Sequence, residues 1–258
     1  MPGLPCFAVL HYAGSGFAGW QQQRAARTVQ GELERVLERL MGRRVVTHAA
    51  GRTDAGVHAT GQVVSFQAPV RWQPAELHKA MNALVPRDIW IERVGRAPTG
   101  FHARRSATGR AYRYVVGSDP AAASPFRRSF EWALPYPLDG VILAQGAAAV
   151  IGGHDFRAFS AAGQVKPHYR CRIARSEWHA RAHGQGFIFD VEADRFLHRM
   201  VRFLVGTMVD AARGRRPVTD VARLLTQADN AEASPPAPPE GLYLVHVRYP
   251  TLDEGAQP

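Results

Sequence analysis

The order of hydrophobic patterns along the chain constrains its fold more than any other feature. Four segments in the first hundred residues have strand patterns and two have the helical period: strands at 5–12, 44–50, 61–67 and 88–95, and helices at 28–41 and 74–84. Their order is β-α-β-β-α-β, which is the order of a split βαβ or ferredoxin-like unit. The sequence therefore predicts an α+β unit over about the first 100 residues.

The first helix has clear signals at both ends. Thr28 is a predicted N-cap and Gly42 a predicted end, because hydroxyls cap helix N-termini and glycine ends helices in the left-handed conformation. The apolar residues between them fall on one face: Val29, Leu33, Val36, Leu37 and Leu40.

The second half repeats the same order with longer insertions. Strands are predicted at 110–117, 170–180, 186–193 and 242–249, and helices at 138–151, 196–213 and near 218–228. The turn-rich stretch 97–108 separates the halves, so we predict an N-terminal domain over 1–100 and a C-terminal domain over 101–258. The proline-rich segment 234–239 predicts a stiff connector into the last strand, or alternatively a polyproline ligand.

The charge balance indicates a polyanionic partner. The formal net charge is +10, and of 32 lysines and arginines only Lys79 and Lys166 are lysines. Arginine suits bidentate phosphate contacts and stacking on bases, so nucleic acid is the favoured partner and a surface kept soluble by charge is the alternative.

Several other classes are disfavoured. No stretch approaches the roughly 20 apolar residues of a membrane span, and the N-terminus lacks signal-peptide features. Cys6 and Cys171 are far apart and the 11 histidines are scattered, so we expect no disulfide, no metal site and a reducing, cytoplasmic location.

One glycine motif resembles a dinucleotide fingerprint. Residues 14–19 read GSGFAG after a strand, but the next helix begins only near Thr28 and not at the glycines. We therefore expect no nicotinamide or flavin binding, and a loop whose glycines let the backbone approach a ligand closely.

The segment Gly51–Ala59, GRTDAGVHA, joins two predicted strands and carries the strongest candidate for chemistry. Arg52 lies two residues before Asp54, so both side chains can point to one side of an extended segment, and their attraction would keep Asp54 ionised as a nucleophile or base. The alternative is a surface Asx turn fixed by a salt bridge.

Two further patterns carry candidate site residues. Strand alternation puts Tyr112 and Tyr114 on one face of segment 110–117. In the predicted helix 196–213, Arg199 and Arg202 share a face with the preceding Arg195, either as a functional stripe or as a solvated basic face. The other face is predicted core and carries Leu197, Val201, Leu204 and Met208.

The motifs together resemble the bacterial tRNA pseudouridine synthase A (TruA-type) family. Besides GRTDAGVHATGQV at 51–63, they follow the family's order along almost the whole chain: GWQ at 19–21, RTVQ at 27–30, Asn82 to Ile89, FHAR at 101–104, YRY at 112–114, HDF at 154–156, FLHRMVR at 196–202 and EGLYL at 240–244.

This resemblance implies an isomerase that converts uridine to pseudouridine in tRNA, at positions 38, 39 and 40 of the anticodon stem-loop, without a cofactor. It also implies two RRM-like halves related by a pseudo-two-fold axis, joined into an extended, mostly antiparallel sheet with helices on one side. The family resemblance further implies a basic cleft and a homodimer.

The resemblance also implies roles for single residues. Asp54 matches the catalytic aspartate, which attacks C1′, adds to C6 of the base or removes a sugar proton; the sequence does not distinguish these. Arg52 orients Asp54 or takes the place of the flipped base, Tyr112 stacks on the base, and Arg202 pairs with the aspartate. Substrate-binding candidates are Tyr112, Leu244, Arg24, Arg104, Arg110, His58 and Arg199.

The chain departs from the family pattern at a few positions. Ala13 replaces the usual aspartate after Tyr12, and Arg157, Ala158, Phe159 and Cys171 replace commoner small polar residues, which affects tRNA preference more than activity. The same sequence features leave two alternatives: an RNA-binding protein with a vestigial site, and a uracil C5 methyltransferase. The intact Asp54, Arg52, Tyr112 and Arg202 disfavour the first, and the lack of a cysteine motif disfavours the second.

Overall fold

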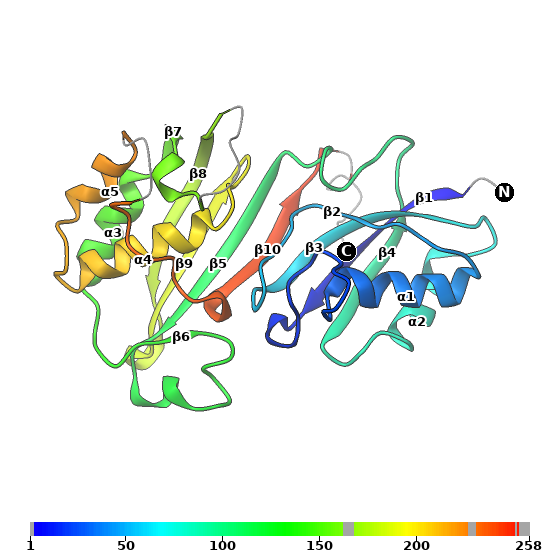
Figure 1. Ribbon diagram of the computed structural model, residues 1–258, viewed down its shortest axis with the longest axis horizontal. Coiled ribbons are helices and arrows are strands. Elements are labelled where there is room, and N and C mark those ends of the chain that lie inside the picture. The colour runs from blue at the N-terminus through cyan, green and yellow to red at the C-terminus, as the bar shows by residue number, and fades with distance from the viewer. Residues whose placement is uncertain (1–2, 162–167, 227–230, 251, 253–258) are drawn as a thin grey trace. The chain divides into compact units, whose positions relative to one another are not determined.

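The chain forms two compact units. The computed structural model describes residues 3–161, 168–226, 231–250 and 252 (Figure 1). Unit 1 comprises Met1–Thr108 together with Leu244–Pro258, and unit 2 comprises Gly109–Tyr243. The predicted domains over 1–100 and 101–258 remain a proposal.

Unit 1 has the predicted β-α-β-β-α-β order. Its elements are β1 Leu4–Tyr12, α1 Val29–Met41, β2 His48–Ala49, β3 His58–Ala68, α2 Pro74–Asn82 and β4 Ile89–Arg96, and the last strand, β10 Leu242–Arg248, enters this unit at Leu244. The strand order is β4-β1-β3-β10, and β1 pairs antiparallel with both β3 and β4. In Figure 1, α1 and α2 lie beside this sheet, where α1 contacts α2 and α2 contacts β4.

The strand predicted at 44–50 is reduced to β2, which pairs with β3 only at Ser65 and Val64. The physical reason is a buried carboxylate on α1. Glu34 accepts hydrogen bonds from the backbone N–H and the hydroxyl of Thr47, at 2.8 and 2.9 Å. These bonds tie the preceding loop to the helix, so it does not extend the sheet.

Both predicted signals of the first helix are confirmed. The Thr28 hydroxyl accepts a hydrogen bond from the Gly31 N–H at 3.2 Å, and Gly42 ends the helix with a φ of 68°, in the left-handed region that glycine tolerates. Val29, Leu33, Val36 and Leu37 are buried as predicted, while Leu40 is only half-buried.

Unit 2 is built on the strand order β5-β9-β8-β7. Its elements are β5 Gly109–Gly117, β6 Trp132–Ala133, α3 Gly140–Ala149, β7 Gly152–Asp155, β8 Arg170–Ala180, β9 Gly186–Ala193, α4 Met200–Ala212 and α5 Thr219–Leu224. The predictions for β5, α3, β8 and β9 are confirmed, whereas the short strands β6 and β7 were not predicted.

The predicted helix 196–213 is wrong at its start. Helix α4 begins at Met200, because Arg199 has a φ of 60° and lies outside the right-handed helical region. Arg195 and Arg199 therefore share no helix face with Arg202, and the predicted arginine stripe does not exist. The predicted core is confirmed, since Leu197, Val201, Leu204 and Met208 are buried.

The predicted fold class is confirmed: the protein is mixed α/β, with few helices and mostly antiparallel strands. Helix α5 is shorter than the predicted segment 218–228, of which residues 227 and 228 lie outside the described residues. No helix among the described residues is long and apolar enough to cross a membrane.

Candidate active site

The Asp54 loop, residues 50–57, connects β2 to β3 as the sequence predicts. Asp54 is half-buried and Arg52 is exposed, while Thr53 and Val57 point inward and are buried. No ion pair joins Arg52 to Asp54 among the described residues, so a salt bridge between these two side chains does not fix the loop. Asp54 is instead presented by a loop whose neighbouring residues anchor it from behind.

The first anchor is a buried hydroxyl pair. The phenol oxygen of Tyr12 lies 2.8 Å from the Thr53 hydroxyl, and Gln62 Nε2 donates to the same phenol oxygen at 3.4 Å. Burial raises the pKa of Tyr12 to about 12, although its hydrogen bonds to Thr53 and Gln62 oppose the shift. Tyr12 therefore stays protonated at neutral pH and can act as a hydrogen-bond donor to Thr53.

The second anchor holds the start of the loop. The amide of Gln62, which is 0% exposed, donates to the Gly51 carbonyl at 2.7 Å and accepts from the Gly51 N–H at 3.4 Å. At the other end, the ring Nδ1 of buried His58 accepts from the backbone N–H of Gly14 at 3.0 Å. His58 thus acts here on the protein's own backbone.

The glycine motif packs directly against the Asp54 loop. A Cβ on Gly14 would lie 2.1 Å from the Val57 carbonyl oxygen, and one on Gly19, whose φ is 93°, would lie 2.8 Å from the Thr53 oxygen. The Trp20 N–H also donates to that Thr53 oxygen, at 3.0 Å. We expected the glycines to admit a ligand; at Gly14 and Gly19 they admit the backbone of the Asp54 loop instead.

An ion pair supports the glycine motif from its outer side. Both terminal nitrogens of Arg27 contact the carboxylate of Asp88, at 2.6 and 2.9 Å, and its guanidinium lies 4.2 Å from the centre of the Phe17 ring. Hydrogen bonding to Arg27 lowers the pKa of Asp88. The N–H of Ala13, the residue that departs from the family pattern, donates to the Asp88 carbonyl at 3.0 Å.

In unit 2, Tyr112 lies on β5 opposite Val191 of β9. Its half-buried ring contacts Phe196 edge to face, with 5.0 Å between ring centres. Tyr114, on the same face of the strand, is fully buried and donates its hydroxyl hydrogen to the Pro238 carbonyl at 2.7 Å. The two tyrosines therefore differ in the way a site residue and a core residue would.

The basic candidates of unit 2 lie near the beginning of α4 and the end of β9. Arg202, half-buried on α4, donates through Nε to the Ala237 carbonyl at 2.6 Å, and Arg110 donates to the Asp194 carbonyl at 3.2 Å. Arg199 is exposed just before α4. Unit 2 thus places Tyr112 and Arg110 on one strand, with Arg202 held by the connector that leads to β10.

The remaining candidates are dispersed in unit 1. Arg24 and Arg104 are exposed in loops, whereas Leu244 is 0% exposed on β10, the environment of a core residue. Both cysteines are buried, and burial raises the pKa of the Cys6 thiol. Neither cysteine has the exposed, activated environment of a nucleophile.

The comparisons with known proteins show the family of the chain. Residues 8–104 and 147–250 match the family described as tRNA pseudouridine synthase. The chain belongs to the tRNA pseudouridine synthase family. Members of this family are isomerases, and the match covers the Asp54 loop, Arg202 and β10.

Individual relatives extend over nearly the whole chain. The "tRNA pseudouridine synthase A" of Moorella thermoacetica is 41% identical over 95% of this chain and 100% of its own. The protein of the same name from Myxococcus xanthus is 42% identical over 93% of this chain and 90% of its own length. The one from Pseudothermotoga lettingae is 37% identical over 94% of this chain and 98% of its own length.

The sequence reasoning missed the residues that hold the Asp54 loop. Tyr12 and Gln62 lie on neighbouring strands, and Gln62 stands next to the buried Val63. A polar amide in an otherwise apolar stretch of strand was the available signal, because a buried amide needs hydrogen-bond partners.

Proposed function

We propose that this protein converts uridine to pseudouridine in tRNA, at positions 38, 39 and 40 of the anticodon stem-loop, with Asp54 as its essential catalytic group. The observation that carries the proposal is the anchored Asp54 loop in a chain of this family. Two side chains and a glycine motif fix the backbone on both sides of Asp54, while its carboxylate stays partly exposed.

The reaction explains why a carboxylate is needed and no cofactor is. The N1–C1′ bond breaks, the uracil turns and a C5–C1′ bond forms; the C5 proton is then lost and N1 gains a proton, which gives the isomer. Product and substrate contain the same atoms, so neither a redox partner nor a group donor takes part. Asp54 supplies the nucleophile or base, and the target nucleotide must leave its stack to reach it.

The other site residues keep the roles that the family resemblance implies. Arg52 orients Asp54 or takes the place of the flipped base, Tyr112 stacks on that base, and Arg202 pairs with the carboxylate. The exposure of Arg52 supports the second of its two roles, since its side chain faces solvent and forms no ion pair with Asp54 among the described residues.

The tRNA contacts belong to the same proposal. Arg24, Arg104, Arg110 and Arg199 contact phosphates, which position an RNA without reading its sequence. His58 and Leu244, both buried, support substrate binding indirectly: His58 fixes the loop at Gly14, and Leu244 packs in the core of unit 1. The protein works as a cytoplasmic homodimer, whose mass light scattering can measure.

The test is release of tritium from C5-labelled uridine in tRNA without any added cofactor. Wild type releases tritium at the modified uridines, and Asp54→Asn, which removes the charge and keeps the volume, releases none. Glu38→Gln, the same chemical change on the exposed surface of α1, is the matched control and keeps full release. No release by wild type would end the proposal, and full release by Asp54→Asn would end the role of Asp54.

A further inference from the structure

A basic hollow lies in unit 1 at the opposite end of β3 from the Asp54 loop. Its volume is about 260 Å³, and it is bounded by the loop after α1, the ends of β1 and β3, and Phe101. Arg43, Arg44 and His48 line it, and no described carboxylate does. We call this hollow the Arg43 pocket.

One wall of the Arg43 pocket is a loop held in a fixed conformation. Glu34, only 8% exposed, accepts from both the N–H and the hydroxyl of Thr47 and from the Gln30 amide at 3.0 Å. The Val45 side chain is buried as well. The loop therefore presents Arg43 and Arg44 on an anchored backbone, while both side chains stay exposed.

Phe101 also lines the pocket, and the turn that follows it is anchored to β3 and to Tyr249. The Ala103 N–H donates to the hydroxyl of Ser65 at 3.0 Å, and the Tyr249 hydroxyl donates to the Ala103 carbonyl at 2.6 Å. The His102 ring stacks on His48, with 4.6 Å between ring centres and an angle of 24° between their planes. The turn after Phe101 is thus held beside the pocket residue His48 by hydrogen bonds and ring stacking.

The positive charge of this region is not neutralised locally. Neither Arg43 nor Arg44 forms an ion pair within the part of the chain that the structure describes, whereas Arg27 and Arg35 pair with carboxylates. His102 accepts backbone N–H bonds at Nδ1 from Arg104 and Arg105, at 3.2 and 3.4 Å. Burial and the charges of His48, Arg105 and Arg104 lower the pKa of His102, as expected in a region of positive potential.

We propose that the Arg43 pocket binds a backbone phosphate of the substrate RNA, as an anchor point remote from the reacting uridine. This inference rests on the proposed function. The pocket is smaller than a typical enclosed ligand site of about 300–1,000 Å³, so it suits one phosphate of a passing chain better than a sequestered metabolite. The arginines provide forked donors, and the His48–His102 pair offers a flat edge beside them.

The position of the pocket along β3 makes the anchor remote. His58 begins the strand beside the Asp54 loop, and Ser65 and Gln67 line the pocket near the strand's other end. At roughly 3.3 Å per residue, the pocket lies about 25 Å along the strand from His58. A phosphate bound there belongs to nucleotides several steps away from the modified one.

The experiment compares full-length tRNA with a short hairpin that carries only the anticodon stem-loop. In the double variant Arg43→Gln/Arg44→Gln, we expect tRNA affinity to fall about tenfold and the slope of log affinity against log salt to decrease by about one, because one phosphate contact is lost. The loss of activity on full-length tRNA then lies in KM and not in kcat, and the loss on the hairpin is much smaller.

The control variant is Arg35→Gln/Arg215→Gln, which removes the same charge from two exposed arginines that pair with carboxylates. An equal loss of affinity in this control, an unchanged salt slope in Arg43→Gln/Arg44→Gln, or an equal loss on the hairpin overturns the pocket proposal. If inorganic phosphate shifts the NMR signals of His48 and His102 while the tRNA salt slope is unaffected, the pocket binds free phosphate and not RNA. Wild type that modifies neither RNA contradicts the proposed function itself.

Discussion

The residues that hold the Asp54 loop in place pack closely against its backbone, and Gly14 makes the closest approach. In Gly14→Ala the new Cβ would meet the Val57 carbonyl at 2.1 Å, so one of the two backbones must move. We expect a loss of about 1–3 kcal/mol in the free energy of unfolding and a marked loss of tritium release, because the loop that carries Asp54 shifts. Gly153→Ala, where nothing lies within 4 Å, is the control and keeps both quantities. Equal behaviour of the two variants would contradict the packing argument.

Tyr12→Phe tests the hydroxyl pair behind the loop. It removes the phenol oxygen that lies 2.8 Å from the Thr53 hydroxyl and keeps the buried ring. We expect the free energy of unfolding, measured in urea, to fall by about 1 kcal/mol, because one hydrogen bond is lost and the buried Thr53 hydroxyl loses its partner Tyr12. Tyr136→Phe, whose ring contacts Arg213 by its face, is the matched change and costs much less. Equal losses of stability in Tyr12→Phe and Tyr136→Phe would contradict a stabilising role of the Tyr12–Thr53 hydroxyl pair.

At the residue scale, local signals were readable from sequence and long-range partners were not. Thr28 and Gly42 cap a helix formed by their immediate neighbours, so sequence spacing predicted both. The hydrogen-bond partner of the Thr53 hydroxyl is Tyr12, 41 residues earlier in the chain, and no local sequence pattern indicates that contact. The predicted ion pair between Arg52 and Asp54 is local in sequence, because two residues separate them. The turn of the loop nevertheless leaves the Arg52 side chain in solvent.

At the scale of elements, the beginning of α4 shows why a hydrophobic period overestimates a helix. Leu197 continues the apolar spacing of Val201 and Leu204, and it is buried like them. Its segment is nevertheless not helical, because Arg199 adopts a φ of 60° and the Asp194 carboxylate accepts backbone N–H bonds from Arg172 and Arg195. A buried Leu197 is therefore compatible with a helical and with a non-helical backbone, and only the tertiary hydrogen bonds determine which one forms.

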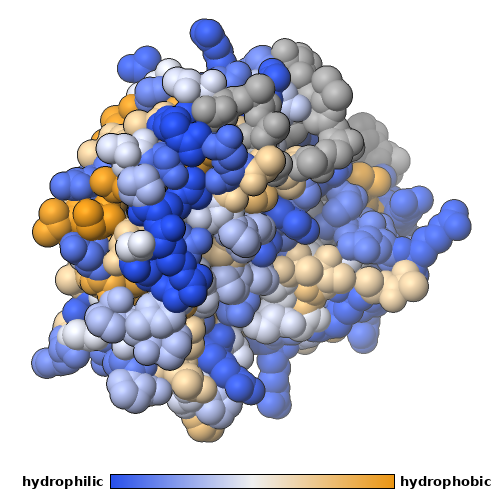
Figure 2. Space-filling model, turned by 60° about the vertical axis from the view of Figure 1, so that its left-hand side comes forward, coloured by the Kyte–Doolittle hydropathy of each residue, from blue (hydrophilic) through white to orange (hydrophobic). Residues whose placement is uncertain are grey.

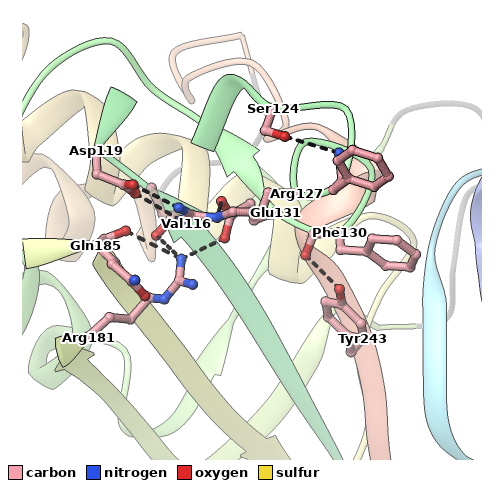
Figure 3. A network of polar contacts seen from close by, with 10 residues as sticks. Val116, Asp119, Ser124, Arg127, Phe130, Glu131, Arg181, Gln185 and Tyr243 are labelled. Atoms are coloured by element: carbon pink, nitrogen blue, oxygen red, sulfur yellow. Dashed lines mark hydrogen bonds and ion pairs between the residues drawn. The ribbon is translucent and has the colours of Figure 1, made fainter. Parts of the chain in front are cut away.

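The insertion between β5 and α3 is held by charges that no period reveals. Glu131, only 4% exposed, pairs with Arg127 at 2.7 Å and with Arg181 at 2.6 Å, and Arg127 also pairs with Asp119 at 2.7 Å (Figure 3). Figure 3 also shows the Tyr243 hydroxyl donating to the Phe130 carbonyl, at 2.5 Å. The network replaces regular secondary structure as the source of order in this segment.

Glu131→Gln tests that network. The variant leaves Arg181 and part of Arg127 without their carboxylate in a partly buried setting, so we expect the free energy of unfolding to fall by about 1.5–3 kcal/mol. Glu177→Gln, whose partner Arg175 is half exposed, is the control and changes stability much less, because solvent screens the pair. Denaturant unfolding followed by circular dichroism measures both, and a Glu131→Gln protein as stable as the control would contradict the assignment.

At the scale of the whole molecule, buried tyrosines predict instability in alkali. Burial raises the pKa of Tyr12 to about 12, and it raises that of Tyr114 and Tyr243 as well. Unfolded tyrosines ionise near pH 10, so between pH 10 and 12 the unfolded state releases protons that the folded state retains. The free energy of unfolding therefore falls as pH rises through this window, by about 2–3 kcal/mol from Tyr12 alone. Urea midpoints at a series of pH values measure the slope, which should be shallower in Tyr12→Phe than in wild type.

The net charge of +10 is likewise a property of the whole chain. It predicts that both the rate of association with RNA and the affinity for RNA depend on salt. Figure 2 shows hydrophilic residues over much of the face that it presents, with hydrophobic ones gathered toward one edge. Many arginines are already paired with carboxylates, as Arg113 is with Asp190 and Arg216 with Asp220, so the phosphate contacts must come from a subset. If tRNA is the substrate, each contact contributes about 0.7–0.9 to the slope of log affinity against log salt. Affinity should then fall at least about tenfold between 50 and 200 mM salt, while the melting temperature of the protein without tRNA changes little. A flat affinity over that range would mean that the arginines serve solubility and not RNA binding.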